Sequence, residues 1–238
     1  MEQSRPGNRL ESISFQPVLA VIFDIDGTIV DSVELHMRAW KRAFEEFGKE
    51  VSYEQIRLQI GKGADDMLPT FFSVEDLGRF GQELKKYRSD IFRREYLPKI
   101  KAFPWVPELF ERIKSENKKI ALASTAKGEE INIYKELAGI GGLVDVVVCS
   151  DEIEESKPHR DICAVALKKL GHIAPDHVIA IGDTPYDAEC ARKMRVRAIG
   201  LLCGGGKREE LQEAGCVAIY ENPAQLLEQY EASPLGLG

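Results

Sequence analysis

Short apolar runs alternate with amphipathic helical stretches along most of this chain. The runs are rich in Val, Ile and Ala and are bounded by polar or turn residues, which is typical of strands buried on both faces of a parallel sheet. We expect strands at 18–23, 119–124, 144–149, 177–181, 197–201 and 216–220. Helices are expected between them at 107–116, 129–137, 160–170, 185–194 and 207–213. The alternation predicts an α/β fold with a doubly wound parallel (Rossmann-like) sheet.

One long segment interrupts this alternation after the first strand. An apolar stripe from Leu35 to Phe47 predicts an amphipathic helix that ends near Gly48. Further helices are expected at 53–60, 74–78 and 83–96, with no convincing strand among them. We therefore predict an all-helical domain at 33–104, inserted into a core formed by 18–32 and 105–238. The linkers of this insert must pass beside the end of the first strand, which is the position of a lid.

Composition narrows the class of partner. The 238 residues include 32 basic and 39 acidic side chains, a net charge of −7 spread without long blocks of one sign. That distribution argues against nucleic-acid or membrane partners and favours a small-molecule site. The five cysteines have no spacing typical of zinc, and we expect reduced thiols. No signal peptide or membrane span is recognisable, so we expect a cytoplasmic protein. We expect it to be a monomer or a weak homodimer.

Two carboxylates follow the first strand directly, in the segment Asp24-Ile25-Asp26-Gly27-Thr28. The carboxyl ends of strands in an open α/β sheet are where such folds bind ligands. Two negative charges side by side in a crevice repel each other, and a divalent cation offsets this cost. Mg²⁺ prefers oxygen ligands and shares its remaining positions with substrate phosphate. The pair therefore predicts Mg²⁺ as cofactor and phosphoryl chemistry.

Other strand ends carry complementary groups. Ser124 and Thr125 follow the second core strand and offer hydroxyls and free amides to phosphate oxygens. Lys157 stands before a proline that can open a helix, and its ammonium would compensate phosphoryl charge. Asp183 follows a later strand and would complete the metal site, with Asp187 four residues on.

These four segments together resemble the haloacid dehalogenase-like hydrolase superfamily. Its motifs run in the same order, as Asp-x-Asp-Gly-Thr, a strand ending in Ser or Thr, an isolated Lys, and Gly-Asp-x-x-x-Asp. The resemblance covers about residues 18–227, and the helical insert resembles the cap of subclass I members related to phosphoglycolate phosphatase and β-phosphoglucomutase. The fold it implies is a Rossmann-like core with an inserted helical cap.

The resemblance also implies roles for the matching residues. Asp24 would be the nucleophile that becomes an aspartyl-phosphate, and Asp26 the general acid and base. Mg²⁺ would be held by Asp24, the backbone carbonyl of Asp26, and Asp183. Asp187 would position Lys157 or a water bound to the metal. The other matching residues would bind the phosphoryl group: Gly27, Thr28, Ser124, Thr125 and Lys157.

The residues of the predicted cap do not identify the substrate. His36 occupies the position of a histidine that helps time the acid/base aspartate in the mutase, although many phosphatases carry one too. Lys62, in a glycine-rich loop resembling the family's specificity loop, is placed to meet an anionic leaving group or simply to be solvated. The mutase's loop arginine falls on Ala64, while its cap lysine could align with Lys86. Lys86 and Arg88 otherwise suit the solvated face of a helix.

Three peripheral segments carry expectations of their own. Trp105 stands where relatives usually have glycine and is expected to pack at the hinge. Gly204-Gly205-Gly206 departs from the phosphate-loop pattern and is expected to be a flexible loop beside the site. Residues 232–238 are expected to fray.

The sequence thus predicts a Mg²⁺-dependent phosphatase that hydrolyses a small phosphorylated metabolite, phosphoglycolate or a sugar phosphate, through an aspartyl-phosphate. One alternative is a phosphoglucomutase that returns the phosphoryl group to the sugar. The other is a binding protein that keeps the fold without turnover.

Overall fold

A parallel sheet forms the centre of the computed structural model, which describes residues 16–152 and 161–236. Its strand order is β5-β4-β1-β6-β7-β8, and every neighbouring pair is parallel. These strands are β1 Ala20–Phe23, β4 Lys119–Ala123, β5 Val146–Val148, β6 Val178–Gly182, β7 Arg197–Leu201 and β8 Cys216–Tyr220. The doubly wound α/β prediction is confirmed.

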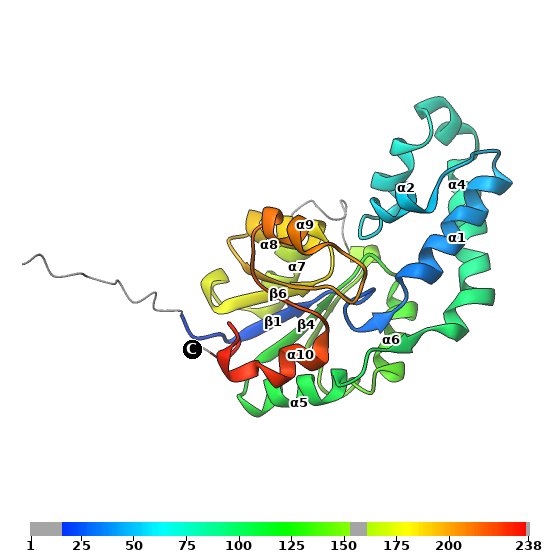
Figure 1. Ribbon diagram of the computed structural model, residues 1–238. Helices are drawn as coiled ribbons and strands as arrows, with labels where there is room; N and C mark the ends of the chain where they lie inside the picture. The colour runs from blue at the N-terminus through cyan, green and yellow to red at the C-terminus, as the bar shows by residue number, and fades with distance from the viewer. Residues whose placement is uncertain (1–15, 153–160, 237–238) are drawn as a thin grey trace, which may run out of the picture.

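Helices cover both faces of the sheet, as Figure 1 shows. They are α5 Val106–Ser115, α6 Gly128–Leu137, α7 Asp161–Leu170, α8 Pro185–Lys193, α9 Arg208–Ala214 and α10 Pro223–Glu228. Alternate residues of β1 serve the two faces: Val21 and Phe23 pack in one apolar cluster with α5, while Ala20 and Ile22 pack in another with α7 and α8. This double burial explains why the central strands are uninterrupted apolar runs.

The inserted helices form a separate lobe of the molecule (Figure 1). They are α1 Val33–Glu46, α2 Tyr53–Arg57, α3 Ala64–Met67 and α4 Val74–Ile91, the last followed by a π-turn at Phe92–Tyr96. The lobe has its own apolar cluster, which includes Trp40, Phe44 and Phe72. We call residues 33–104 the cap, and this division of the chain stays a prediction.

The structure corrects several local expectations in and near the cap. The helices expected at 74–78 and 83–96 are one, because Gly78 and Gly81 do not interrupt α4. The two linkers of the cap pair as short antiparallel strands, β2 Val30–Asp31 and β3 Lys101–Ala102, too short for a sequence pattern to reveal. Trp105 does not pack at the hinge, since 55% of its surface is exposed.

The C-terminal segment packs against the core instead of fraying as far as it is described. Ser233 and Leu235 are fully buried. The ammonium of the buried Lys118 donates to the carbonyl of Leu235 at 2.5 Å and to the hydroxyl of Tyr230 at 3.2 Å. Helix α10, which the sequence analysis missed, lies beside α5 (Figure 1). The expectation of fraying was therefore wrong for residues 232–236.

Candidate active site

Three carboxylates meet at the carboxyl ends of neighbouring strands. Asp24 follows β1 and Asp183 follows β6, and these strands pair in register from Ala20 with Val178 to Phe23 with Ile181. Asp24, Asp183 and Asp187 each place an oxygen within 4.8 Å of the other two. A set of three carboxylate oxygens suits a hard divalent cation such as Mg²⁺. The residues present therefore fit the predicted metal.

Close backbone packing fixes the position of Asp183. Its side chain is buried and accepts a hydrogen bond from Thr28 Oγ1 at 3.3 Å. A Cβ atom on Gly27 would lie 2.4 Å from Asp183 Oδ2, and one on Gly204 would lie 1.8 Å from it. Only glycine fits at either position. The loop expected to be flexible at 204–206 thus lies beside the site as predicted, but Gly204 is there to make room for a carboxylate.

Asp187 is held by the start of its own helix. Its Oδ2 accepts hydrogen bonds from Thr184 N at 3.1 Å and Thr184 Oγ1 at 2.6 Å, while Thr184 caps α8 by accepting from the amide of Asp187. This reciprocal capping box satisfies helix-terminal amides. It also fixes the carboxylate beside Asp24 and Asp183.

Ser124 takes the predicted place at the end of β4, the neighbour of β1 on the other side. It is buried, and its Oγ accepts a hydrogen bond from the amide of Ala126 at 3.1 Å. Thr125 lines the cleft between cap and core. Lys157 lies outside the described residues, so its role stays a prediction, as do the phosphate-binding roles of Gly27, Thr28, Ser124 and Thr125.

The second aspartate of the first motif, Asp26, is not among the three clustered acids and has partners of its own. Asp26 Oδ1 accepts from Ser32 Oγ at 2.6 Å and lies 2.8 Å from His36 Nε2. Burial alone would raise the pKa of Asp26, but the charge and hydrogen bond of His36, together with Ser32 and Arg88, lower it. The environment of this carboxylate thus differs from that of the three clustered acids. The predicted metal contact through the backbone carbonyl of Asp26 stays a prediction.

Comparison with known proteins agrees with this arrangement. Residues 21–201 match the family model of the haloacid dehalogenase-like hydrolases. The chain belongs to this family. A phosphorylated carbohydrates phosphatase of Thermotoga maritima is 29% identical over 87% of this chain and 96% of its own length. A phosphoglycolate phosphatase of Aquifex aeolicus is 26% identical over 77% of this chain and 84% of its own.

Solved structures share the fold. A hydrolase from Pseudomonas syringae superimposes with a TM-score of 0.81 at 28% identity, covering 91% of this chain and 99% of that one. A putative β-phosphoglucomutase from Bacteroides vulgatus gives a TM-score of 0.80 at 19% identity, covering 92% and 90%. The predicted family is confirmed, and the names of the relatives agree with the predicted phosphoric monoester hydrolase. Among the described residues, no helix is long and apolar enough to cross a membrane.

In this hydrolase Arg88, from helix α4 of the cap, contacts His36, the neighbour of Asp26. Its Nη2 contacts His36 Nδ1, and its guanidinium lies 5.0 Å from the ring centre of Trp40 and 4.7 Å from that of Phe92. Lys86, which the sequence analysis aligned with the mutase's cap lysine, is 75% exposed and pairs with Asp90. The exposure of Lys86 agrees with the solvated face expected of it, whereas the same expectation was wrong for Arg88, whose Nε is buried. The signal was its position in α4 between the buried Leu84 and Ile91.

A cleft of about 640 Å³ lies between the cap and the strand ends of the core. Both aspartates of the first motif line it, together with cap and core side chains that include Lys62, Arg88, Lys127 and the buried Glu130. Lys62 Nζ donates to Gln59 Oε1 at 2.8 Å and lies 4.9 Å from the ring centre of Tyr186. Sequence reasoning identified Lys62 but gave no indication of Glu130, which lies in the first turn of an ordinary helical pattern.

Proposed function

We propose that the protein is a Mg²⁺-dependent phosphatase that hydrolyses a small phosphorylated metabolite, phosphoglycolate or a sugar phosphate. The observation that carries the proposal is the separation of the aspartates: Asp24 lies within an acidic cluster, and Asp26 bonds to Ser32 and His36. Two carboxylates in different environments suit two different roles. The names of the relatives, a phosphatase of phosphorylated carbohydrates and a phosphoglycolate phosphatase, support the substrate class.

The chemistry divides between these two side chains. An oxygen of Asp24 attacks the phosphorus, the bond from phosphorus to the ester oxygen breaks, and Asp26 gives its proton to the departing alcohol. In the second half, Asp26 takes a proton from a water that attacks the phosphorus of the aspartyl-phosphate. The bond from phosphorus to Asp24 then breaks, which restores the carboxylate and releases phosphate.

The surrounding residues set up both halves. Ser32 and His36 hold the Asp26 carboxylate in one orientation and, with Arg88, lower its pKa. Asp26 must therefore take up a proton when the phosphate binds before it can act as the acid, and it then acts as the base in the second half. Mg²⁺, held by Asp24, the carbonyl of Asp26, and Asp183, would neutralise negative charge between nucleophile and phosphate. The cap covers the cleft and presents its side chains to the leaving group, which is the expected means of excluding water.

The test is phosphate release from a panel of phosphorylated metabolites. We expect release in the presence of Mg²⁺, none with a chelator, and recovery when Mg²⁺ is restored. Release that survives thorough chelation would contradict the metal dependence. No release from any member of a broad panel, by protein that binds Mg²⁺, would favour a binding protein of the same fold.

One observation favours a second function. His36 lies between Asp26 and Arg88, so the acid/base group is coupled to the cap, as would suit a phosphoglucomutase that must exclude water while its substrate reorients. Against it, the structure provides no arginine at the loop position of Ala64, which lines the cleft. Formation of glucose 6-phosphate from β-glucose 1-phosphate, faster than phosphate release, would establish the mutase. A cytoplasmic location and a monomeric or weakly dimeric state stay predictions.

A further inference from the structure

A second contact between cap and core lies at Tyr186, next to the acidic cluster in the sequence. This residue stands between Asp183 and Asp187 in the last motif, and no step of the proposed chemistry uses it. Its hydroxyl donates to the backbone carbonyl of Leu58, at the end of α2 in the cap, at 2.6 Å. Burial, together with Glu189 and Glu210, raises the pKa of Tyr186, so the hydroxyl remains a donor.

The hydrogen bond meets a need of the cap. Helix α2 covers only Tyr53–Arg57, and the last carbonyls of a helix have no partners within it. Tyr186 supplies one of these partners from the core. Beside it, Arg57 Nη1 donates to the carbonyl of Gly205 at 2.7 Å, and its other terminal nitrogen lies 4.0 Å from Glu210. We call residues 57–62 the cap loop. It is attached to the core by two hydrogen bonds, one donated by Tyr186 of the core and one donated by Arg57 of the cap loop.

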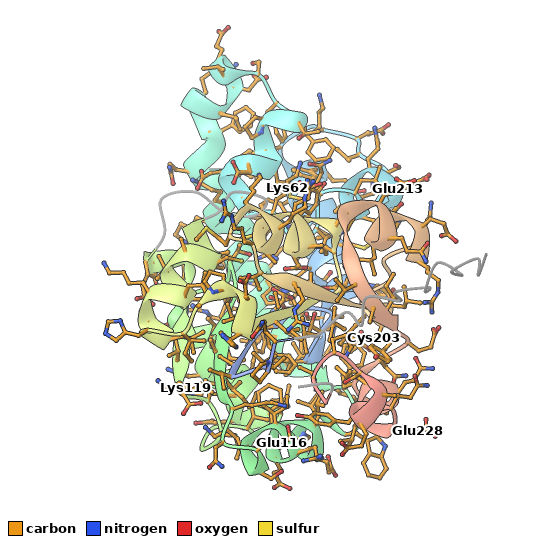
Figure 2. The ribbon with its side chains drawn as sticks, turned by 90° about the vertical axis from the view of Figure 1, so that its left-hand side faces the viewer. Lys62, Glu116, Lys119, Cys203, Glu213 and Glu228 are labelled. Atoms are coloured by element: carbon orange, nitrogen blue, oxygen red, sulfur yellow. The ribbon has the colours of Figure 1, made fainter. Side chains whose placement is uncertain are left out.

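The ring of Tyr186 has a separate contact. The ammonium of Lys62 lies 4.9 Å from its centre, within the range of a cation–π interaction. Figure 2 shows Lys62 at the level where the cap meets the core. Lys85 and Lys86, on the cap wall of the same cleft, pair with Asp65 and Asp90. Within the described part of the chain, no carboxylate lies within ion-pairing distance of Lys62, and its partners are the neutral groups of Gln59 and Tyr186.

We propose that Tyr186 is a positioning residue with two effects: its hydroxyl holds the cap loop against the core, and its ring keeps Lys62 directed at an anionic group on the leaving portion of the substrate. Closure of the cap and recognition of that anion are then one event. The role of Lys62 rests on the proposed function, because it assumes a substrate with a leaving group. The attachment of the cap loop does not depend on turnover.

The first test needs no substrate. Hydrogen exchange of the cap loop is compared in wild type, Tyr186→Phe and Tyr53→Phe, where Tyr53 is an exposed tyrosine at the start of the same α2. Loss of one hydrogen bond to the core is expected to speed exchange in Tyr186→Phe about fivefold. Tyr53→Phe is expected to match wild type. Equal exchange in all three proteins would overturn the attachment.

The second test separates the ring from the hydroxyl. Dissociation constants are measured for phosphoglycolate, whose leaving group carries a carboxylate, and for glucose 6-phosphate, whose leaving group is neutral. Asp24→Asn serves as background so that nothing is turned over. Tyr186→Phe is expected to weaken both ligands alike. Tyr186→Leu and Lys62→Met are each expected to shift the ratio about fivefold further against phosphoglycolate.

The double variant Tyr186→Leu/Lys62→Met tests whether the ring of Tyr186 acts through Lys62 or independently of it. If the ring acts through Lys62, the double variant shifts the ratio no further than either single change. A ratio that Lys62→Met changes and Tyr186→Leu does not, with both proteins folded by thermal unfolding, would overturn the role of the ring. If the wild-type protein, with Asp24 intact, binds these ligands but does not hydrolyse them, the proposed function is contradicted and the role of Tyr186 is not. If neither probe binds, the role of Lys62 is overturned and the exchange result alone decides the attachment.

Discussion

Core and cap place their site residues by different means. In the core, Asp24, Ser124 and Asp183 each follow a strand, and the parallel register brings the three strand ends to one edge of the sheet. In the cap, His36 and Arg88 project from the faces of α1 and α4, and their contact depends on how these helices pack. The position of a side chain at a strand end follows from the order of the strands in the sheet. The position of a side chain on a helix depends on which helices pack against that face.

The largest expected effect tests the core directly. Asp24→Asn keeps the shape of the side chain but removes the anionic nucleophile, so phosphate release should fall on the order of 10³-fold or more. Steady-state release at saturating Mg²⁺ measures it, with Mg²⁺ binding followed separately by calorimetry. Activity within tenfold of wild type would mean that another group attacks the phosphorus.

A second core variant tests how tightly the acidic cluster is packed. In Gly204→Ala the new methyl group would lie 1.8 Å from Asp183 Oδ2, so the carboxylate must move. We expect kcat to fall about 100-fold, since small misplacements of reacting groups are costly. Gly78→Ala is the matched control, because no atom lies within 4 Å of its added Cβ. Equal activity in both variants would show that Asp183 tolerates displacement.

The cap is tested by Arg88→Met, which removes the partner of His36 Nδ1 while keeping apolar contact with Trp40 and Phe92. We expect kcat to fall about 10- to 30-fold with little change in Mg²⁺ binding, because Arg88 acts on Asp26 through its contact with His36 and through its own charge. Lys86→Met, on the exposed side of the same α4, should change kcat less than about twofold. A larger effect at Lys86 than at Arg88 would reverse our assignment.

These differences explain what the sequence could predict. An apolar run with a carboxylate behind it marks both a strand and its end, so Asp24 and Asp183 were identifiable without knowing any contact. Arg88 and Lys86 have similar charge and lie two residues apart, and only the packing of α4 on α1 distinguishes them. The short pair β2 and β3, and the burial of Leu235 on Lys118, likewise depend on contacts between distant segments.

A smaller effect concerns the buried C-terminal segment of the core. Glu116 accepts hydrogen bonds from Tyr230 and Lys118 and pairs with Arg112, near the end of α5 (Figure 2). Burial would raise the pKa of Glu116, but these partners lower it below its ordinary value of 4.5. Its charged form therefore stabilises the fold above about pH 4.5, and this contribution disappears as the pH falls through the lowered pKa.

Glu116→Gln should thus unfold more easily at pH 7, by about 1 kcal/mol, and the difference from wild type should shrink as the pH falls below about 4. Urea unfolding at both pH values measures it. Glu213→Gln, at an exposed glutamate of α9, is the control and should differ little from wild type at either pH. A difference for Glu116→Gln that is constant with pH would mean that its charge contributes nothing.

The smallest effect lies at the border of cap and core. Trp105 adopts a left-handed backbone conformation with φ of 67° just before α5, where its side chain is mostly exposed. A side chain costs roughly 1 kcal/mol in this conformation, and glycine loses part of that gain through its more flexible unfolded state. Trp105→Gly should therefore stabilise the protein by about 0.5 kcal/mol in urea unfolding. Trp105→Ala, which keeps a Cβ, separates backbone strain from loss of the ring: destabilisation by both variants would mean that the indole contributes packing.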